Sequence, residues 1–192
     1  MIMQTTSITT KPKKIISDQN AFLILKITMG NMNLLKNELD KLIAYDSDMQ
    51  ENSREITEKQ INLLCTKSFE AKIFDLVSAI GNKNLKLAIE SYNNLLFLKE
   101  QPIMILTMIS RQFVLLLQTK IFLENNNDIN SIAQKLNTRS FVIYDCAKQA
   151  KNFSESVLIS AIKECTETDF KIKTGRLTDK LAVETLIIKY AS

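Results

Sequence analysis

One segment, residues 102–123, constrains the fold of this chain more than any other part of the sequence. It reads PIMILTMISRQFVLLLQTKIFL and is apolar around nearly all of its circumference when wound as a helix. Pro102 suits a first helical turn, and no Gly or further Pro follows to interrupt the helix. Such a helix would be roughly 33 Å long. We therefore expect a central helix on which other helices pack.

Two narrow polar strips interrupt the apolar surface of this predicted helix. Thr107, Arg111 and Gln118 fall within about 40° of one another, and Gln112 and Thr119 form the second strip. An Arg between apolar turns must reach a carboxylate, a carbonyl oxygen or the surface. We expect Arg111 to find a partner within the chain or at a subunit interface.

The rest of the chain is also patterned for helices. Only 3 Gly and 2 Pro occur in 192 residues, which leaves few of the turns that β-hairpins need. A hydrophobic content of 45% is enough to bury a sizeable core. The sequence therefore predicts an all-α protein, with helices near residues 18–29, 31–45, 58–65, 72–80, 85–98, 102–123, 129–136, 140–150, 155–174 and 178–190.

The helix ends carry recognisable signals. Ser17 or Asp18 can cap the first helix, and Gly30 is predicted to close it as the left-handed residue just after its end. Thr57 and Gln60 match a capping box. Ser154 is predicted to cap the helix at 155–174.

Helical periodicity also predicts which side chains face inward. These include Leu85 in the helix at 85–98, Val157 in the helix at 155–174, and four residues of the final helix: Leu181, Val183, Leu186 and Ile187.

The second predicted helix is amphipathic. Four apolar side chains form its inward face, with charged side chains expected outside: Leu35, Leu39, Leu42 and Ile43 within, and Lys36, Glu38 and Lys41 outside. The polar segment 46–55 is predicted to be a loop or a domain boundary. Residues 1–14 are polar and aperiodic, and are expected to be a disordered tail or a remnant of cloning or truncation.

Composition narrows the function. The chain has no His, so the commonest general base and the commonest transition-metal ligand are missing. Cys65, Cys146 and Cys165 are widely spaced and are expected to be free thiols in a reducing cytosol. No glycine-rich phosphate-binding motif is present. We expect no catalytic residues, no cofactor and no metal site.

Nothing in the sequence predicts a membrane protein. No apolar run approaches the ~20 residues of a membrane span, and the N-terminus lacks the apolar segment of a signal peptide. The net charge of +4 is mild and does not by itself establish nucleic-acid binding. We expect a cytoplasmic protein.

Two basic or helix-turn-helix-like features leave nucleic-acid binding open. One is a cluster that could meet phosphate or an acidic protein surface, or could be a solvated helix end: Lys163, Lys171, Lys173, Arg176 and Lys180. The other is the segment 131–150, where Ala133, Asn137 and Ile143 stand at helix-turn-helix offsets. Its second helix offers chiefly apolar side chains, which favours ordinary helix packing.

Several motifs in order resemble the delta subunit of the bacterial DNA polymerase III clamp loader. The stretch GNMNLLKNELDKL at 30–42 is similar to a family pattern of Gly and Asn followed by N-E-L-E-K-L, matched here by Gly30, Asn31, Asn37, Glu38 and Lys41. The resemblance continues through ITE at 56–58, IFDLVSAI at 73–80, and PI at 102–103 with RQF at 111–113, which contains Arg111 and Gln112. It ends at DFKIKTG, which contains Asp169, Lys173 and Gly175.

The resemblance covers roughly residues 15–192 and implies two domains. Residues 15–55 would be the end of an AAA+ lid domain, and 57–192 a helical collar that mediates oligomerisation. A whole delta subunit begins with a nucleotide-binding-like AAA+ domain that opens the sliding clamp, and that domain has no counterpart here. Contact with the sliding clamp is therefore not expected from this chain. Asn33 stands where ATP-hydrolysing relatives commonly have a sensor Arg, in keeping with the family's lack of ATPase activity.

The function implied by the resemblance is assembly. In this family the collar packs beside the collars of the ATPase (gamma/tau) subunits and of delta prime during DNA replication. This chain would then be a non-catalytic scaffold, part of a holoenzyme that is a DNA-directed DNA polymerase. Two alternatives remain: a nucleic-acid-binding helical domain using the 163–180 basic cluster or the 130–150 helix pair, with weak DNA binding, and a free-standing helical adaptor.

Overall fold

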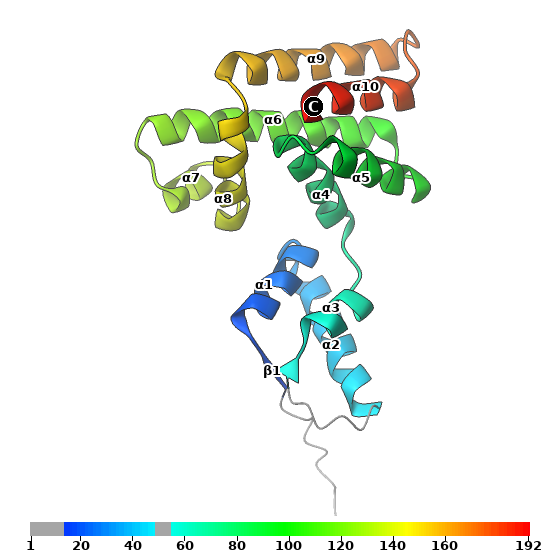
Figure 1. Cartoon of the computed structure of the whole chain (residues 1–192), viewed down its shortest axis with the longest axis vertical. Helices are drawn as coiled ribbons and strands as arrows, with labels where there is room; N and C mark the ends of the chain where they lie inside the picture. Colours follow the sequence, from blue (N-terminus) through cyan, green and yellow to red (C-terminus); the bar gives the residue numbers. More distant parts are fainter. Residues whose placement is uncertain (1–13, 49–54) are drawn as a thin grey trace, which may run out of the picture. The chain divides into compact units, whose positions relative to one another are not determined.

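The computed structural model describes residues 14–48 and 55–192, apart from the side chains of residues 46–48. It confirms the all-α prediction, with the helices close to the expected positions (Figure 1). The helices are α1 (Asp18–Ile27), α2 (Met32–Asp48), α3 (Glu58–Leu64), α4 (Phe69–Gly81), α5 (Leu85–Phe97), α6 (Pro102–Glu124), α7 (Ile129–Lys135), α8 (Ser140–Gln149), α9 (Glu155–Lys173) and α10 (Asp179–Ala191), with a 3-10 turn η1 (Ala150–Asn152).

The chain divides into two compact units, Met1–Ala71 and Lys72–Ser192, which we call unit 1 and unit 2. This division places α3 with unit 1, because Ile61 is fully buried in the same core as residues of α1 and α2. The lid and collar assignments, with their boundary near residues 55–57, remain predictions. The predicted tail at 1–14 lies almost wholly outside the described residues.

Unit 1 is built from α1, α2 and α3 around a small aliphatic core. Its buried members come from all three helices and from the segment just before α3: Ile24, Ile27, Leu42, Ile56 and Ile61. The sequence did not predict the short parallel pair formed by β1 (Ile15–Ile16) and β2 (Glu55–Ile56). The side chain of Asn20 donates a hydrogen bond of 2.9 Å to the Ile56 carbonyl oxygen and ties α1 to this pair.

The end of α1 differs from the prediction by one residue. Ser17 caps its start as expected. At its other end Met29, with φ of 48°, takes the left-handed position that was assigned to Gly30, and Gly30 follows with φ of 66°. The Gly30 amide donates to the Leu25 carbonyl oxygen at 2.9 Å, closing a Schellman-type end. Helix α1 ends earlier than its apolar pattern suggested.

Helix α2 is longer than predicted. It continues to Asp48, so the start of the segment assigned to a loop is helical. Asp46, Ser47 and Asp48 are weak helix formers, but none of them is a Gly or Pro that would end the helix. The remainder of that segment, 49–54, lies outside the described residues. The capping box of Thr57 and Gln60 at the start of α3 is confirmed.

Unit 2 is organised around α6, with α8, α9 and α10 packed along it (Figure 1). Phe113 lies at the middle of this packing. The centre of its ring is 5.1 Å from the ring centre of Tyr190 and 6.2 Å from that of Phe153. Alpha9 faces the core with the small side chains of Ala161 and Cys165, which lets helices approach closely. The predicted central helix is therefore confirmed as the centre of unit 2.

The two polar strips of α6 have different fates. Thr107, Arg111 and Gln118 are exposed, whereas Gln112 and Thr119 are buried. Three predicted inward residues elsewhere are wrong: Leu85 is 36% exposed, Val157 39% and Leu181 63%. Each lies in the first turn of its helix.

By length and composition alone, α6 could span a membrane, so the expectation that no segment reaches that length is wrong for residues 102–124. Only 39% of its most apolar window is buried. One such helix is weak evidence for a membrane span, because the central helix of a soluble bundle meets the same criteria. Here α6 is the helix on which the rest of unit 2 packs.

Candidate interaction site

The first family motif forms a helix start. The side-chain oxygen of Asn31 accepts hydrogen bonds from the amides of Asn33 at 3.1 Å and Leu34 at 3.2 Å, so Asn31 caps α2. Gly30 supplies the left-handed turn directly before it. Asn37 is exposed one turn further along the helix. Gly30 and Asn31 therefore join α1 to α2.

Glu38 is buried, which corrects its predicted outward position. Its side chain lies between Leu35 and Leu42 on the helix surface, at the edge of the inward face. One carboxylate oxygen accepts a hydrogen bond from the Thr66 amide at 3.3 Å and lies 2.5 Å from the Lys41 ammonium nitrogen. Lys41 also donates to the Leu64 carbonyl oxygen at 3.3 Å. A buried carboxylate is tolerated here because it has both a counter-charge and an amide donor.

The same carboxylate affects the neighbouring thiol of Cys65, which is partly buried. Burial raises the pKa of Cys65 to about 11, and the charge and hydrogen bonding of Glu38 add to the rise. A thiol with such a pKa is protonated near neutral pH and is a poor nucleophile. Cys65 is thus a packing residue at the end of α3.

Gln112, in the RQF motif at residues 111–113, is a buried link between helices. Its side-chain nitrogen donates to the Gln149 side-chain oxygen at 3.0 Å and lies 3.6 Å from the Cys146 sulfur. Burial raises the pKa of the Cys146 thiol to about 12. Arg111, the neighbour of Gln112, is exposed and makes no ion pair or hydrogen bond with any residue that the structure describes. The partner predicted for Arg111 within the chain is therefore not found among those residues.

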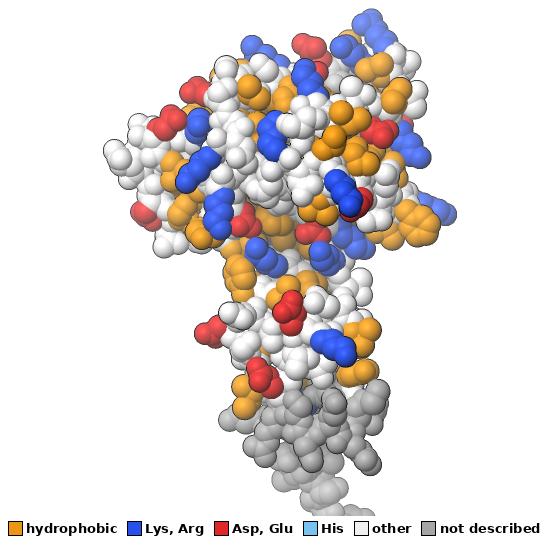
Figure 2. Space-filling view, viewed as in Figure 1, with side chains coloured by type: hydrophobic (Ala, Val, Ile, Leu, Met, Phe, Trp, Pro, Cys, Tyr) orange, Lys and Arg blue, Asp and Glu red, His pale blue; other side chains and the backbone are white. Residues whose placement is uncertain are grey.

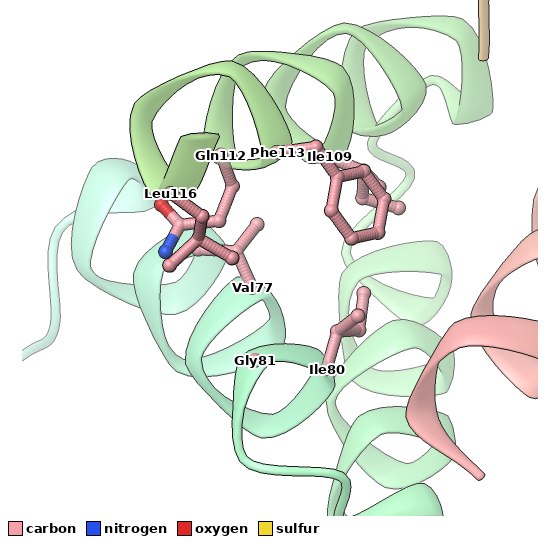
Figure 3. Close-up of a pocket in the computed structure, with 7 residues that line it drawn as sticks. All are labelled: Val77, Ile80, Gly81, Ile109, Gln112, Phe113 and Leu116. Atoms are coloured by element: carbon pink, nitrogen blue, oxygen red, sulfur yellow. The ribbon is translucent and has the colours of Figure 1, made fainter. Parts of the chain in front are cut away.

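A narrow gap between α4 and α6 adjoins this link (Figure 3). Ile109, Gln112, Phe113 and Leu116 of α6 face Val77, Ile80 and Gly81 of α4. The gap has no room for even a water molecule, so it is a packing feature. It does not provide a ligand site.

The last family motif, DFKIKTG at residues 169–175, closes α9. Lys173 and Asp169 form an ion pair at 2.7 Å, four residues apart on the helix surface. Gly175 adopts a φ of 70°, and the Arg176 amide donates to the Lys171 carbonyl oxygen at 2.8 Å. Nothing lies within 4 Å of the place a Cβ would occupy on Gly175, so Gly is required here by the backbone angle alone.

The basic cluster does not form one patch. Lys171 and Lys173 are two residues apart on α9 and therefore point to different sides of the helix. Lys173 pairs with Asp169, and Lys171 lies 3.9 Å from Glu167. Arg176 lies over the Phe170 ring at 5.7 Å. Lys163 and Lys180 are exposed on different helices. Figure 2 shows Lys and Arg spread among acidic and apolar side chains over the visible face of the protein.

Two surfaces were missed in the sequence. The first is the outer face of α8, where Ser140, Tyr144 and Lys148 are exposed and Val142, Ile143 and Cys146 are buried on the opposite side; Arg139 just before α8 and Lys151 just after it are also exposed. Ala133 and Ile143 are buried as in a helix-turn-helix, and Asn137 has a left-handed φ of 46° in the turn. The apolar residues that weakened this motif in the sequence face the core. Separating the inward from the outward face would have shown an exposed Tyr144 and Lys148 one turn apart.

The second missed feature is a set of exposed apolar side chains on unit 2. Its most exposed members come from α5, the turn after it, α6 and α10: Phe97 at 87%, Leu98 at 47%, Met104 at 48%, Leu181 at 63% and Ile188 at 45%. Apolar side chains are visible over α10 and near the end of α5 (Figure 2). The run Leu96, Phe97 and Leu98 was the available signal, because three successive helix residues cannot all face one core.

Within residues 14–48 and 55–192, no group of three or more His, Cys, Asp or Glu side chains could hold a metal ion. The motif residues instead cap helices, pair charges on one helix or bridge neighbouring helices. The fold and these contacts define a helical bundle protein whose characteristic residues organise packing.

Comparison with known proteins gives the family. The model of the DNA polymerase III delta subunit, C-terminal domain, matches residues 70–190, which is most of unit 2. The chain therefore belongs to the family of DNA polymerase III clamp-loader delta subunits, as the motifs predicted.

Two relatives from Bacillus subtilis agree. The DNA polymerase III subunit delta of strain 168 is 30% identical over 177 residues, which cover 92% of this chain and 50% of the relative. The solved structure of the DNA clamp loader delta protein matches with a TM-score of 0.80 and 29% identity, over 93% of this chain and 52% of the other. The chain spans about half the length of these relatives.

Proposed function

We propose that this chain is a non-catalytic assembly part of a clamp-loader delta subunit in the cytoplasm, and that unit 2 packs as a collar against neighbouring subunits. The observation that carries this proposal is the exposed apolar surface of α5, α6 and α10 on a domain of this family. Phe97, at 87% exposure, is unusual for a large apolar side chain on a monomer. Arg, Met and Phe are residue types enriched at protein interfaces.

The proposed partners are the ATPase (gamma/tau) subunits and delta prime, as the family resemblance implies. This chain covers about half of a delta subunit. The segments that match the relatives include the helical family domain at residues 70–190. Ring assembly is the activity that we assign to the chain.

The proposal is tested by mixing this chain with the ATPase and delta-prime subunits of the same organism and measuring the mass of the complex in solution. We expect co-migration in one complex that contains a single copy of this chain. A matched variant, Phe97→Ser, should weaken the complex and leave the helical content unchanged, because Phe97 is exposed. The collar proposal fails if the wild-type chain and the partner subunits migrate separately.

A second candidate function is binding of nucleic acid, favoured by the basic outer face of α8 rather than by the 163–180 cluster. Arg139, Lys148 and Lys151 are exposed there, and the Lys148 ammonium lies 4.2 Å from the centre of the Tyr144 ring. Side chains of these kinds contact phosphates and bases. Binding to duplex DNA measured at increasing salt distinguishes the two candidates. Weak binding that vanishes at moderate salt, beside a stable subunit complex, favours assembly.

A further inference from the structure

The connector between α3 and α4, residues 65–68, is held by unit 1 at both ends. Thr66 donates its amide to the buried Glu38 carboxylate at 3.3 Å, and Ser68 donates its amide to the Ile27 carbonyl oxygen at 3.0 Å. Lys41 reaches the Leu64 carbonyl oxygen just before the connector. Although the connector has no regular secondary structure, its backbone is therefore bonded to α1 and α2.

The connector also sets the start of α4. The Ser68 hydroxyl accepts a hydrogen bond from the Ala71 amide at 3.1 Å and caps the helix. Ser68 is thus bonded in two directions, through its amide to α1 and through its hydroxyl to α4. A change in the position of α1 or α2 would move Ser68 and with it the first turn of α4.

We propose that Glu38 and Lys41 form a clamp that fixes the connector to α2, so that α2 and the start of α4 move together. This assigns a positioning role to two residues of the family motif in α2, independently of the proposed function in assembly. An unclamped chain of four residues would act as a flexible tether. The clamp makes it a fixed link.

The buried position of Glu38 supports a clamp rather than a chance surface pair. Its relative exposure is 7%, and a carboxylate is buried at a free-energy cost unless its partners compensate. Its partners are Lys41 on its own helix and the Thr66 amide 28 residues later in the chain. Removing the carboxylate leaves the Thr66 amide without its acceptor.

Amide hydrogen exchange tests the clamp directly on the full chain. Glu38→Met keeps the length of the side chain and removes the acceptor. We expect exchange at Thr66 to rise about tenfold or more, exchange at Ser68 to rise less, and the helical amides of α2 to stay protected. Trypsin cleavage after the exposed Lys67 should accelerate in parallel. The control is Asp40→Asn, which removes one negative charge from α2, as Glu38→Met does, but at an exposed position. It should leave all of these rates unchanged.

Two results would overturn the clamp. One is equal exchange at Thr66 in Glu38→Met and Asp40→Asn. The other is faster exchange at Thr66 without any change at Ser68 or in cleavage after Lys67, since Ile27 alone would then hold the connector. If Glu38→Met unfolds unit 1, Glu38→Gln replaces it, because its amide oxygen is a weaker acceptor. An intermediate rise at Thr66 is then expected, and no rise would contradict the clamp.

Discussion

The side-chain nitrogen of Gln112 in α6 donates a 3.0 Å hydrogen bond to the side-chain oxygen of Gln149 at the end of α8. Both side chains are buried. The same oxygen would lie 2.2 Å from a Cβ atom on Gly81 of α4. Asn152, just beyond α8, donates to the Gly81 carbonyl oxygen at 2.9 Å. Three helices of unit 2 are thus joined at one polar contact inside an apolar core.

Gly81→Ala should lower the free energy of unfolding by about 1–2 kcal/mol, although Ala normally favours a helix. The added methyl displaces the Gln149 side chain and breaks its bond to Gln112. Urea unfolding followed by circular dichroism measures the change. In a protein that already carries Gln149→Ala, Gly81→Ala should lower the free energy of unfolding by less. Equal losses with and without Gln149→Ala would show that the added methyl group does not act through Gln149.

Thr119→Val should leave unfolding unchanged or stabilise the protein by up to about 1 kcal/mol. The Thr119 hydroxyl is fully buried and has no hydrogen-bond partner within the described part of the chain. Valine replaces it with a group of the same shape and removes an unpaired polar atom. Thermal unfolding measures the effect. A clear destabilisation would mean that the hydroxyl is paired in solution.

Gly175→Ala should destabilise the chain by about 1 kcal/mol, because the φ of 70° disfavours any residue with a Cβ. Gly175→Asn should cost less, since Asn tolerates the left-handed region. No atom lies near the added group, so the cost comes from the backbone alone. Equal unfolding midpoints for Gly, Asn and Ala at this position would contradict that explanation.

Glu164 makes the packing of α9 on α10 sensitive to acid. Burial alone would raise the pKa of Glu164, but hydrogen bonds from Lys189 at 2.7 Å and Tyr190 at 2.6 Å leave it below its usual value of 4.5. The stabilisation of the folded protein by ionised Glu164 is therefore present above pH 4.5. It is lost as the pH falls through the lower pKa that Glu164 has in the folded protein. The stability difference between wild type and Glu164→Gln should be largest near neutral pH and should shrink in acid. A difference that does not vary with pH would contradict this linkage.

Arg111→Ala should leave the free energy of unfolding within about 0.5 kcal/mol of wild type, since Arg111 is exposed and unpaired among the residues that the structure describes. If the collar proposal holds, the variant should weaken binding to the partner subunits. Gln118→Ala, on the same exposed strip, is the matched control. Isothermal titration measures both. Unchanged binding would show that this strip does not face a neighbouring subunit.

Much of the fold was predictable because local signals and helical periodicity agreed. Ser17, Thr57 and Ser154 cap the helices to which the sequence assigned them. The ends of helices were harder to place than their starts. Helix α1 stops early because Met29 takes the left-handed position ahead of Gly30, and α2 runs on to Asp48, where no Gly or Pro ends it. The errors at Leu85, Val157 and Leu181 all fall in the first turn of a helix, because a periodic pattern does not show whether another helix covers that turn.

The roles of the motif residues needed the structure. A Glu between two Lys residues on a helix normally faces solvent, so nothing local revealed that Glu38 is buried against the Thr66 amide 28 residues later. Gln112 and Arg111 are adjacent in sequence, yet one is buried and the other exposed. The outer face of α8 was hidden for the opposite reason, because its core residues dominated the composition of that segment.

The apolar circumference of α6 also affects how the protein is made. Helix α4 precedes α6 in the chain, but three of the helices packed on α6, namely α8, α9 and α10, follow it, so during synthesis α6 leaves the ribosome before most of the helices that cover it. For that interval a long apolar helix is exposed to other chains, a state prone to aggregation. The yield of soluble protein should therefore depend on completion of the last two helices, however well the earlier ones form.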